Sequence, residues 1–546
     1  MIAEAFISEQ PQETEGCLGE FDPRIHPELT LQTYESFAGG PERKADREAF
    51  ANGDTYHLEM TYPELSEEIA ADKKHIVKGL RNKAVEAYGA ESLTVSSIDY
   101  RILETDFLAS AARLNALSEG ADTEALQAEA DKFVELTEAL YGKPDQKIVD
   151  DMLFDLKKRY TTKDARVQAL WEEVEAGFTT HLSDGTEVQV PALIIPTEGE
   201  PLPALSEQAA VLLEQEWKLA FPAVVEARGV VGDIIASSED LDINYKPEDI
   251  IFSGIRTAQL FRMAADGIAH QHRSQPFDVI EKENGTTASW DSSRQAIIIG
   301  LQRSPEAGKW GPIRKVGVHE SMHGLKSSNG LNSGEPAMAT GVFSKNPDGS
   351  YTDYLTFEEG NNKLGESVVG YIDDEDEILQ SRYNLYLMAG LVYGGLNDRQ
   401  AKEVFGKLVS IERLSLKPEL DEKQIEAGTA RSSANKVERL FRGTPTTEEV
   451  LVDGHKPIFT KDIAYYKGTV IATEFWNGVA ESALDLGQTA YDEVIANGEN
   501  IALAEKQKRL TTREYFRKIF EIQCQGKIDP TNEQQYAEAV AAYDRK

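Results

Sequence analysis

The chain is poor in cysteine and in basic residues, and it has no long apolar run. It has two cysteines, Cys17 and Cys524, in 546 residues, too few for a disulfide framework, and neither lies in a metal-type cluster. The 57 Lys and Arg residues face 94 Asp and Glu residues, and the formal net charge of -37 argues against binding to nucleic acid or to an anionic membrane. Met1 to Gly16 lacks the basic start and apolar core of a signal peptide, and no run is long enough to cross a bilayer. We therefore expect a cytoplasmic protein. The sequence does not indicate its oligomeric state.

The length and the local patterns predict several domains. Residues 1–65 are rich in polar residues, Pro and Gly and show little periodicity, which predicts a mobile N-terminal arm or a loosely docked cap. Residues 66–200 read as a helical N-terminal domain, and residues 201–546 as a larger second domain. The fold class expected is α+β, dominated by helices, with one small sheet.

That sheet is predicted just before residue 310. Phe277 to Glu283, the turn Asn284-Gly285 and Thr286 to Trp290 resemble a hairpin, and Gln295 to Gly300 is a further apolar strand. An exposed edge there would suit an extended peptide, which would add as one more strand. An ordinary sheet without a functional edge is an equal alternative.

The stretch His319-Glu320-Ser321-Met322-His323 is an HExxH pattern in a chain with only nine histidines. On a helix, two histidines four residues apart have Cβ atoms about 6 Å from each other, so both imidazoles can bind one ion. Glu320 would lie beside that ion and accept a proton from metal-bound water. The pattern predicts a metal-binding site for hydrolysis; the alternative is an amphipathic helix with two ordinary histidines.

The neighbouring residues support a helix at the HExxH pattern. Pro312 suits a first helical turn, and one apolar stripe faces the core, formed by Val318, Met322 and Leu325. A catalytic zinc needs a third protein ligand. Ser327 to Tyr354 reads mostly as loop, after which a second helix would bring in Glu359 or, second in preference, Glu358.

Four stretches resemble the domain-of-unknown-function family that includes the microtubule-associated tyrosine carboxypeptidases, whose bacterial members are named for a QEGLA motif. Together they span roughly residues 100 to 530. They are Leu140-Tyr141-Gly142-Lys143-Pro144, His319 to Gly330, Phe357-Glu358-Glu359-Gly360, and Glu438-Arg439-Leu440-Phe441-Arg442-Gly443-Thr444 leading to Phe459-Thr460-Lys461-Asp462-Ile463-Ala464-Tyr465-Tyr466-Lys467-Gly468.

The resemblance implies a zincin-like metallopeptidase catalytic domain of the gluzincin type within residues 201–546. It implies that His319, His323 and Glu359 bind Zn²⁺ and that Glu320 is the general base. The chain departs from the family at two places. Two residues, not three, separate Glu320 from the second histidine, and Asn361-Asn362 replaces the Leu and Ala of the QEGLA motif.

Further site residues are predicted from the same stretches. Tyr465, or the adjacent Tyr466, could stabilise the oxyanion. A peptide C-terminal carboxylate needs a cation, for which the candidates are Arg439, Arg442 and Lys461; a structural ion pair is the alternative for each. Asn329 and Glu366 are candidates for orienting the ligand histidines, and a surface carboxylate is the alternative for Glu366.

The function predicted is that of a hydrolase: a zinc metalloprotease, with carboxypeptidase activity on the C-terminus of a peptide or protein as the first choice. The C-terminal residue removed would be aromatic if the resemblance extends to specificity. An endopeptidase or aminopeptidase with the same site is one alternative. The other is a non-catalytic regulatory or scaffold protein that retains the fold.

Overall fold

The computed structural model describes residues 19–30, 41–58, 66–118, 122–222, 250–272, 274, 277–346, 350–369, 383–442, 444 and 450–545. Helices dominate this part of the chain and three small sheets accompany them, so the α+β class is confirmed. None of the helices within these ranges combines the length and the apolar character needed to traverse a membrane.

The first half of the chain is helical apart from one hairpin. Its elements are η1 (Gly19–Phe21), η2 (Pro27–Thr30), α2 (Pro41–Asn52), α3 (Glu67–Tyr88), α4 (Leu93–Ser118), α5 (Thr123–Tyr141), α6 (Gln146–Arg159), α7 (Ala165–Ala176), β1 (Phe178–His181), β2 (Glu187–Val190), α8 (Glu207–Ala220) and α11 (Gly254–His272).

The second half contains the remaining strands and the longest helix, of 33 residues. Its elements are β3 (Asp278–Lys282), β4 (Ala288–Asp291), β5 (Ala296–Gly300), η4 (Glu306–Gly308), α12 (Trp310–Gly330), α13 (Ala337–Thr340), β6 (Phe343–Lys345), β7 (Tyr351–Asp353), α14 (Tyr354–Val368), α15 (Asn384–Tyr393), α16 (Asp398–Leu416), α17 (Glu422–Leu440), η6 (Lys461–Ile463), α18 (Ala464–Ala496), α19 (Ile501–Gln523) and α20 (Glu533–Asp544).

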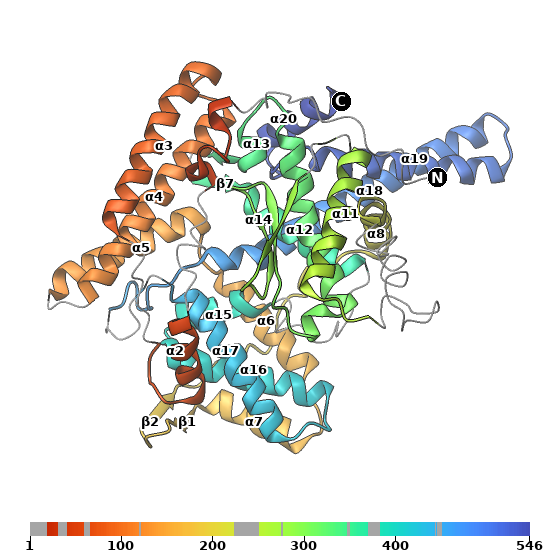
Figure 1. Cartoon of the computed structure of the whole chain (residues 1–546). Helices are drawn as coiled ribbons and strands as arrows, with labels where there is room; N and C mark the ends of the chain where they lie inside the picture. The colour runs from red at the N-terminus through yellow and green to blue at the C-terminus, as the bar shows by residue number, and fades with distance from the viewer. Residues whose placement is uncertain are drawn as a thin grey trace, which may run out of the picture.

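The helices pack around three main hydrophobic cores. One core lies at the centre, where the sheet, α11, α12 and α14 meet α18 and α19 (Figure 1). A second joins α6 and α7 to α15, α16 and α17, and a third lies under α4 and α5. The second core mixes residues from before and after position 200, so the predicted boundary there does not coincide with a boundary between cores.

Residues 41–58, which we expected within an arm or a cap, lie against α16 and α17. Phe50 is fully buried in the second core. The Arg399 guanidinium donates to the carbonyl oxygens of Phe50 and Tyr56, at 3.0 Å each, and to that of Thr55. This segment is therefore fixed by backbone contacts as well as by apolar packing.

The central sheet has the strand order β3-β5-β4, and this corrects the predicted hairpin of 277–290. β3 and β4 do not pair with each other: β5 lies between them, parallel to β3 and antiparallel to β4. The reason is that β5, with the sequence AIIIG, is the most apolar strand and takes the buried central position. The actual hairpin is β4–β5, which leaves β4 as the edge strand beside α12.

Two glycines allow a close crossing of α14 and α18. A Cβ added at Gly468 would lie 2.8 Å from the carbonyl carbon of Thr356 and closer still to its oxygen. A Cβ at Gly360 would overlap the Gly468 carbonyl group. The stretch around Glu359 and the stretch 459–468 are therefore in backbone contact, although about a hundred residues separate them along the chain.

Candidate metal centre

Helix α12 confirms the predicted setting of the HExxH pattern. The helix begins at Trp310, so that Pro312 falls in its first turn, and the stripe of Val318, Met322 and Leu325 is fully buried in the central core. The helix continues to Gly330, so residues 327–330 are helical and not loop as we expected. Packing of the stripe fixes the rotation of α12 and thereby turns the two histidines toward α14.

The two histidines and Glu359 converge on one point. The Nε2 atom of His319 lies 3.2 Å from a carboxylate oxygen of Glu359, and Nε2 of His323 lies 3.7 Å from the other oxygen. The three potential ligand atoms are all within 4.8 Å of one another. Separations of this size suit ligands on a common ion about 2 Å from each. Glu359, and not Glu358, is the acid that meets both Nε2 atoms.

Two further carboxylates orient the histidine rings. His319 Nδ1 lies 2.7 Å from Glu366, as predicted, and His323 Nδ1 contacts Glu358. A carboxylate on Nδ1 favours the tautomer whose proton is on that atom, which leaves the Nε2 lone pair for a metal. From the sequence, Glu358 was a candidate only as a ligand. Its place directly before Glu359, on the neighbouring face of α14, is the signal that could have indicated this second role.

Asn329 does not take the orienting role predicted for it. Its side-chain amide donates to the carbonyl oxygen of Cys524 at 2.6 Å, which ties the end of α12 to the loop after α19. The physical reason is distance along the helix: Asn329 lies six residues after His323 and cannot face the same ion.

The histidines and carboxylates of the centre shift each other's pKa values. Burial works to lower the pKa of His319, but hydrogen bonds to Glu359 and Glu366 outweigh it and raise that pKa to about 10. Burial works to raise the pKa of Glu359, but His319 and His323 lower it to about 2. Near neutral pH the metal-free His319 is therefore protonated and paired with anionic carboxylates, and a divalent ion would replace its proton.

Glu320 lies on the side of the centre that faces the sheet. Its carboxylate accepts a hydrogen bond from the backbone N–H of Trp290 in β4, at 2.6 Å. Burial raises the pKa of Glu320 above its usual value. A raised pKa makes a carboxylate a better proton acceptor near neutral pH, which is the property of a general base.

The two asparagines that replace Leu and Ala are both accommodated in fully buried positions. Asn361 Oδ1 accepts a hydrogen bond from the indole N–H of Trp476 in α18, at 2.8 Å. The Asn362 amide lies 3.3 Å from the His319 carbonyl and 3.2 Å from Nε2 of His323. Asn361 therefore links α14 to α18 by a hydrogen bond, and Asn362 places its amide group directly beside the two histidines.

The three predicted carboxylate-binding cations have different surroundings. Arg439 donates to both oxygens of Asp462, at 2.9 and 2.7 Å, so the structure gives it the alternative role of a structural ion pair. Arg442 is buried just after α17. The side chain of Lys461 is half-buried and makes no direct hydrogen bond or ion pair with the part of the chain that the structure describes. Burial lowers its pKa, and Glu359 is among the acids that oppose this shift.

The two candidate tyrosines for the oxyanion, Tyr465 and Tyr466, differ in burial and in neighbours. Tyr466 is buried in the second core, with its ring 5.0 Å from that of Tyr386. Tyr465 is half-buried, between Lys363 at 6.0 Å and Arg439 at 5.9 Å from its ring centre. Since Lys363 also binds Glu366 at 3.0 Å, Tyr465 lies on the Glu366 side of the metal centre and is the better candidate of the two.

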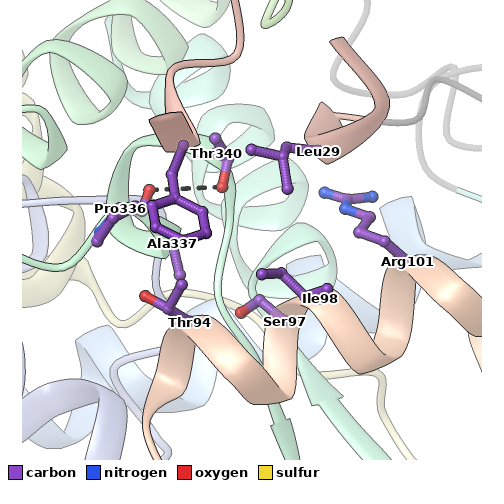
Figure 2. A pocket seen from close by; sticks show the side chains of 9 residues that line it. Leu29, Thr94, Ser97, Ile98, Arg101, Pro336, Ala337 and Thr340 are labelled. Atoms are coloured by element: carbon purple, nitrogen blue, oxygen red, sulfur yellow. Dashed lines mark hydrogen bonds between the residues drawn. The ribbon is translucent and has the colours of Figure 1, made fainter. Parts of the chain in front are cut away.

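Two pockets lie away from this centre. One lies between α4 and α13, where Arg101, Ser97 and Ile98 face Ala337 and Thr340 (Figure 2). Its volume of about 10 Å³ is no more than one water molecule requires. A larger cavity of about 590 Å³ lies between α7 and α16, and two of its charged residues, Lys407 and Glu173, pair with each other.

Comparison with known proteins returned no match among family models, curated proteins or solved structures. The function of the chain must therefore be argued from the site itself. Two imidazoles with Nδ1 bound to carboxylates, a third carboxylate opposite both Nε2 atoms and a nearby glutamate form a donor set that fits zinc.

Proposed function

We propose that the chain is a zinc-dependent peptidase, and specifically a carboxypeptidase, built on a zincin-like arrangement. The observation that supports this most directly is the convergence of His319, His323 and Glu359, with Glu320 adjacent. A site used only for structure has four protein ligands and no need of a base, whereas three ligands leave a position open for chemistry. Bound there, zinc would act as a Lewis acid and lower the pKa of a water ligand toward about 7.

Residues of the chain would supply proton transfer, orientation of the ligands and stabilisation of the oxyanion. Glu320 takes the proton of the attacking water and delivers it to the leaving amine, and the Trp290 N–H holds its carboxylate in place. Glu366 and Glu358 keep the two histidines oriented. Tyr465 is the candidate donor to the developing oxyanion.

One feature would hold an extended peptide beside the centre, and a second favours cleavage at its C-terminus. Strand β4 is an edge strand next to α12, where an extended peptide can pair with it. Lys461 is a half-buried cation on which Glu104, Asp462 and Glu359 act electrostatically, but it forms no direct ion pair with any of the three. A terminal carboxylate would supply a direct ion-pair partner, which an internal peptide bond would not.

The test is a Glu320→Gln substitution assayed on peptides with free and with amidated C-termini. We expect the variant to fold, to bind zinc as the wild type does, and to lose at least ~100-fold in kcat. The wild type should cleave the free peptide and leave the amidated one intact. A variant with wild-type activity would refute the assigned base, and equal cleavage of both peptides would favour an endopeptidase.

A further inference from the structure

Gln295 has a backbone conformation that residues with a side chain rarely adopt. Its φ is +53°, in the left-handed region, where glycine is favoured because it has no Cβ atom to clash with the backbone. The residue is the last one before β5, in the turn that follows β4, and glycine is common at such turn positions. Strain of this kind persists only where the surrounding contacts hold the residue in place.

The buried side chain of Gln295 bridges the end of β4 to α12. Its Nε2 atom donates to the backbone carbonyl oxygen of Ser292, just after β4, at 2.6 Å. Its Oε1 atom accepts from the hydroxyl of Ser327 in α12, at 2.6 Å, and that hydroxyl also lies 2.8 Å from the Ala339 carbonyl oxygen. Ser327 lies four residues after His323, on the same face of the helix. The bridge therefore connects the edge strand to the helix that carries the histidines.

The bridge reaches the part of β4 that holds Glu320. The backbone N–H of Trp290, which donates to the Glu320 carboxylate at 2.6 Å, lies two residues before Ser292. The Trp290 indole N–H and the Lys527 ammonium both donate to the Ser292 hydroxyl, at 3.0 Å each. Ser292 is thus held through its carbonyl and through its hydroxyl, and a shift of this residue would carry the Trp290 N–H with it.

We propose that Gln295 is a positioning residue for Glu320. Strand β4 pairs on one side only, with β5, so the ladder does not set the distance between its free edge and α12. The Gln295 amide sets that distance and thereby places the Trp290 N–H that holds the carboxylate of the base. This role rests on the function proposed above and adds to it a residue that contacts neither the ion nor the substrate.

The test is Gln295→Gly, which relieves the backbone conformation and removes the bridge. Glycine would serve the turn at least as well as glutamine, so a residue needed only for the turn would be replaced without loss. On a peptide with a free C-terminus we expect the zinc content and KM of the wild type, but a kcat lower by ~10- to 100-fold, since a misplacement of about 1 Å can cost ~100-fold. The denaturation midpoint should change little, because relief of strain opposes the loss of hydrogen bonds.

Hydrogen exchange and a second variant test the bridge itself. The backbone amides of β4 should exchange faster in Gln295→Gly than in the wild type, while those of α16 keep their rate. Ser327→Ala removes the bridge at its α12 end and should also lower kcat. The double variant should lose no more than the weaker of the two single variants, because both changes break the same connection.

Asp453→Gly is the matched control. Asp453 is the other residue besides the glycines that has a positive φ, +51°, among the described residues, and it is exposed in the turn between Val452 and His455. Glycine relieves the same conformation there without a change in β4 or α12, so kcat and the exchange of β4 should stay as in the wild type. Gln295→Asn replaces Gln295→Gly if that variant does not fold: asparagine tolerates a positive φ, but its amide is one methylene too short for both partners.

The possible results distinguish this role from the function on which it rests. Absence of zinc-dependent hydrolysis from the wild type would overturn the proposed function, and the role of Gln295 with it. With an active wild type, an unchanged kcat or unchanged exchange of β4 in Gln295→Gly would overturn the positioning role alone. Additive losses from Gln295→Gly and Ser327→Ala, or a fall in zinc content that matches the fall in kcat, would overturn it as well.

Discussion

The crossing of α14 and α18 makes Gly468→Ala a test of how the metal centre is assembled. The added methyl group would lie 2.8 Å from the Thr356 carbonyl carbon, 3.0 Å from the Gly360 nitrogen and closer to the Thr356 oxygen. All three are backbone atoms, which cannot move without moving the helix. We therefore expect α14 to shift away from α18 and to take Glu359 with it.

The free-energy change combines two opposing contributions. Alanine in place of glycine favours the helix by about 1 kcal/mol, while overpacking against rigid neighbours costs about 3 kcal/mol. The net loss should be about 2 kcal/mol in the free energy of unfolding, measured by chemical denaturation. Displacement of Glu359 should also weaken zinc binding at least ~10-fold, measured by chelator competition.

Gly478→Ala on the same helix is the matched control. A Cβ at this position meets no atom within 4 Å, so the change should stabilise the protein by about 0.5–1 kcal/mol and leave zinc affinity unchanged. If Gly468→Ala behaved like Gly478→Ala in both assays, the close crossing and its link to Glu359 would be refuted.

Two further predictions concern the neighbours of Glu359. Asn361→Leu removes the acceptor of the buried Trp476 indole N–H and should cost about 1–3 kcal/mol in the free energy of unfolding; an unchanged denaturation midpoint would contradict this. Zinc binding near neutral pH should release about one proton, because the metal-free pKa of His319 is about 10 and its Nε2 must lose a proton to bind the ion. Affinity should therefore rise with pH. Calorimetry in buffers of different ionisation enthalpy measures the proton count, and a count of zero would refute the coupling.

The local part of the centre could be predicted from the sequence. The HExxH spacing together with the stripe of Val318, Met322 and Leu325 was sufficient for the helix and for its buried face. Both features depend on residues within one or two turns. The preference for Glu359 over Glu358 was already part of the prediction from the residues, and the resemblance strengthened it because the glutamate of the QEGLA motif matches Glu359.

The long-range part could not be predicted. Insertion of β5 between β3 and β4 depends on which strand is most deeply buried, while local turn signals favoured a hairpin of β3 and β4. Lys527 donates to Ser292, just after β4, from a loop nearly two hundred residues after α12, and no periodicity of the sequence indicates this contact. The ion pair of Arg439 with Asp462 likewise depends on the packing of η6 against the end of α17.

The metal content of the purified wild-type protein, measured beside that of a His323→Ala variant, is the direct test of the metal centre. We expect about one zinc per wild-type chain and loss of that zinc in the variant, with both proteins folded. Absence of metal from the wild type after zinc is supplied, or equal zinc in both proteins, would contradict a metal centre at His319, His323 and Glu359.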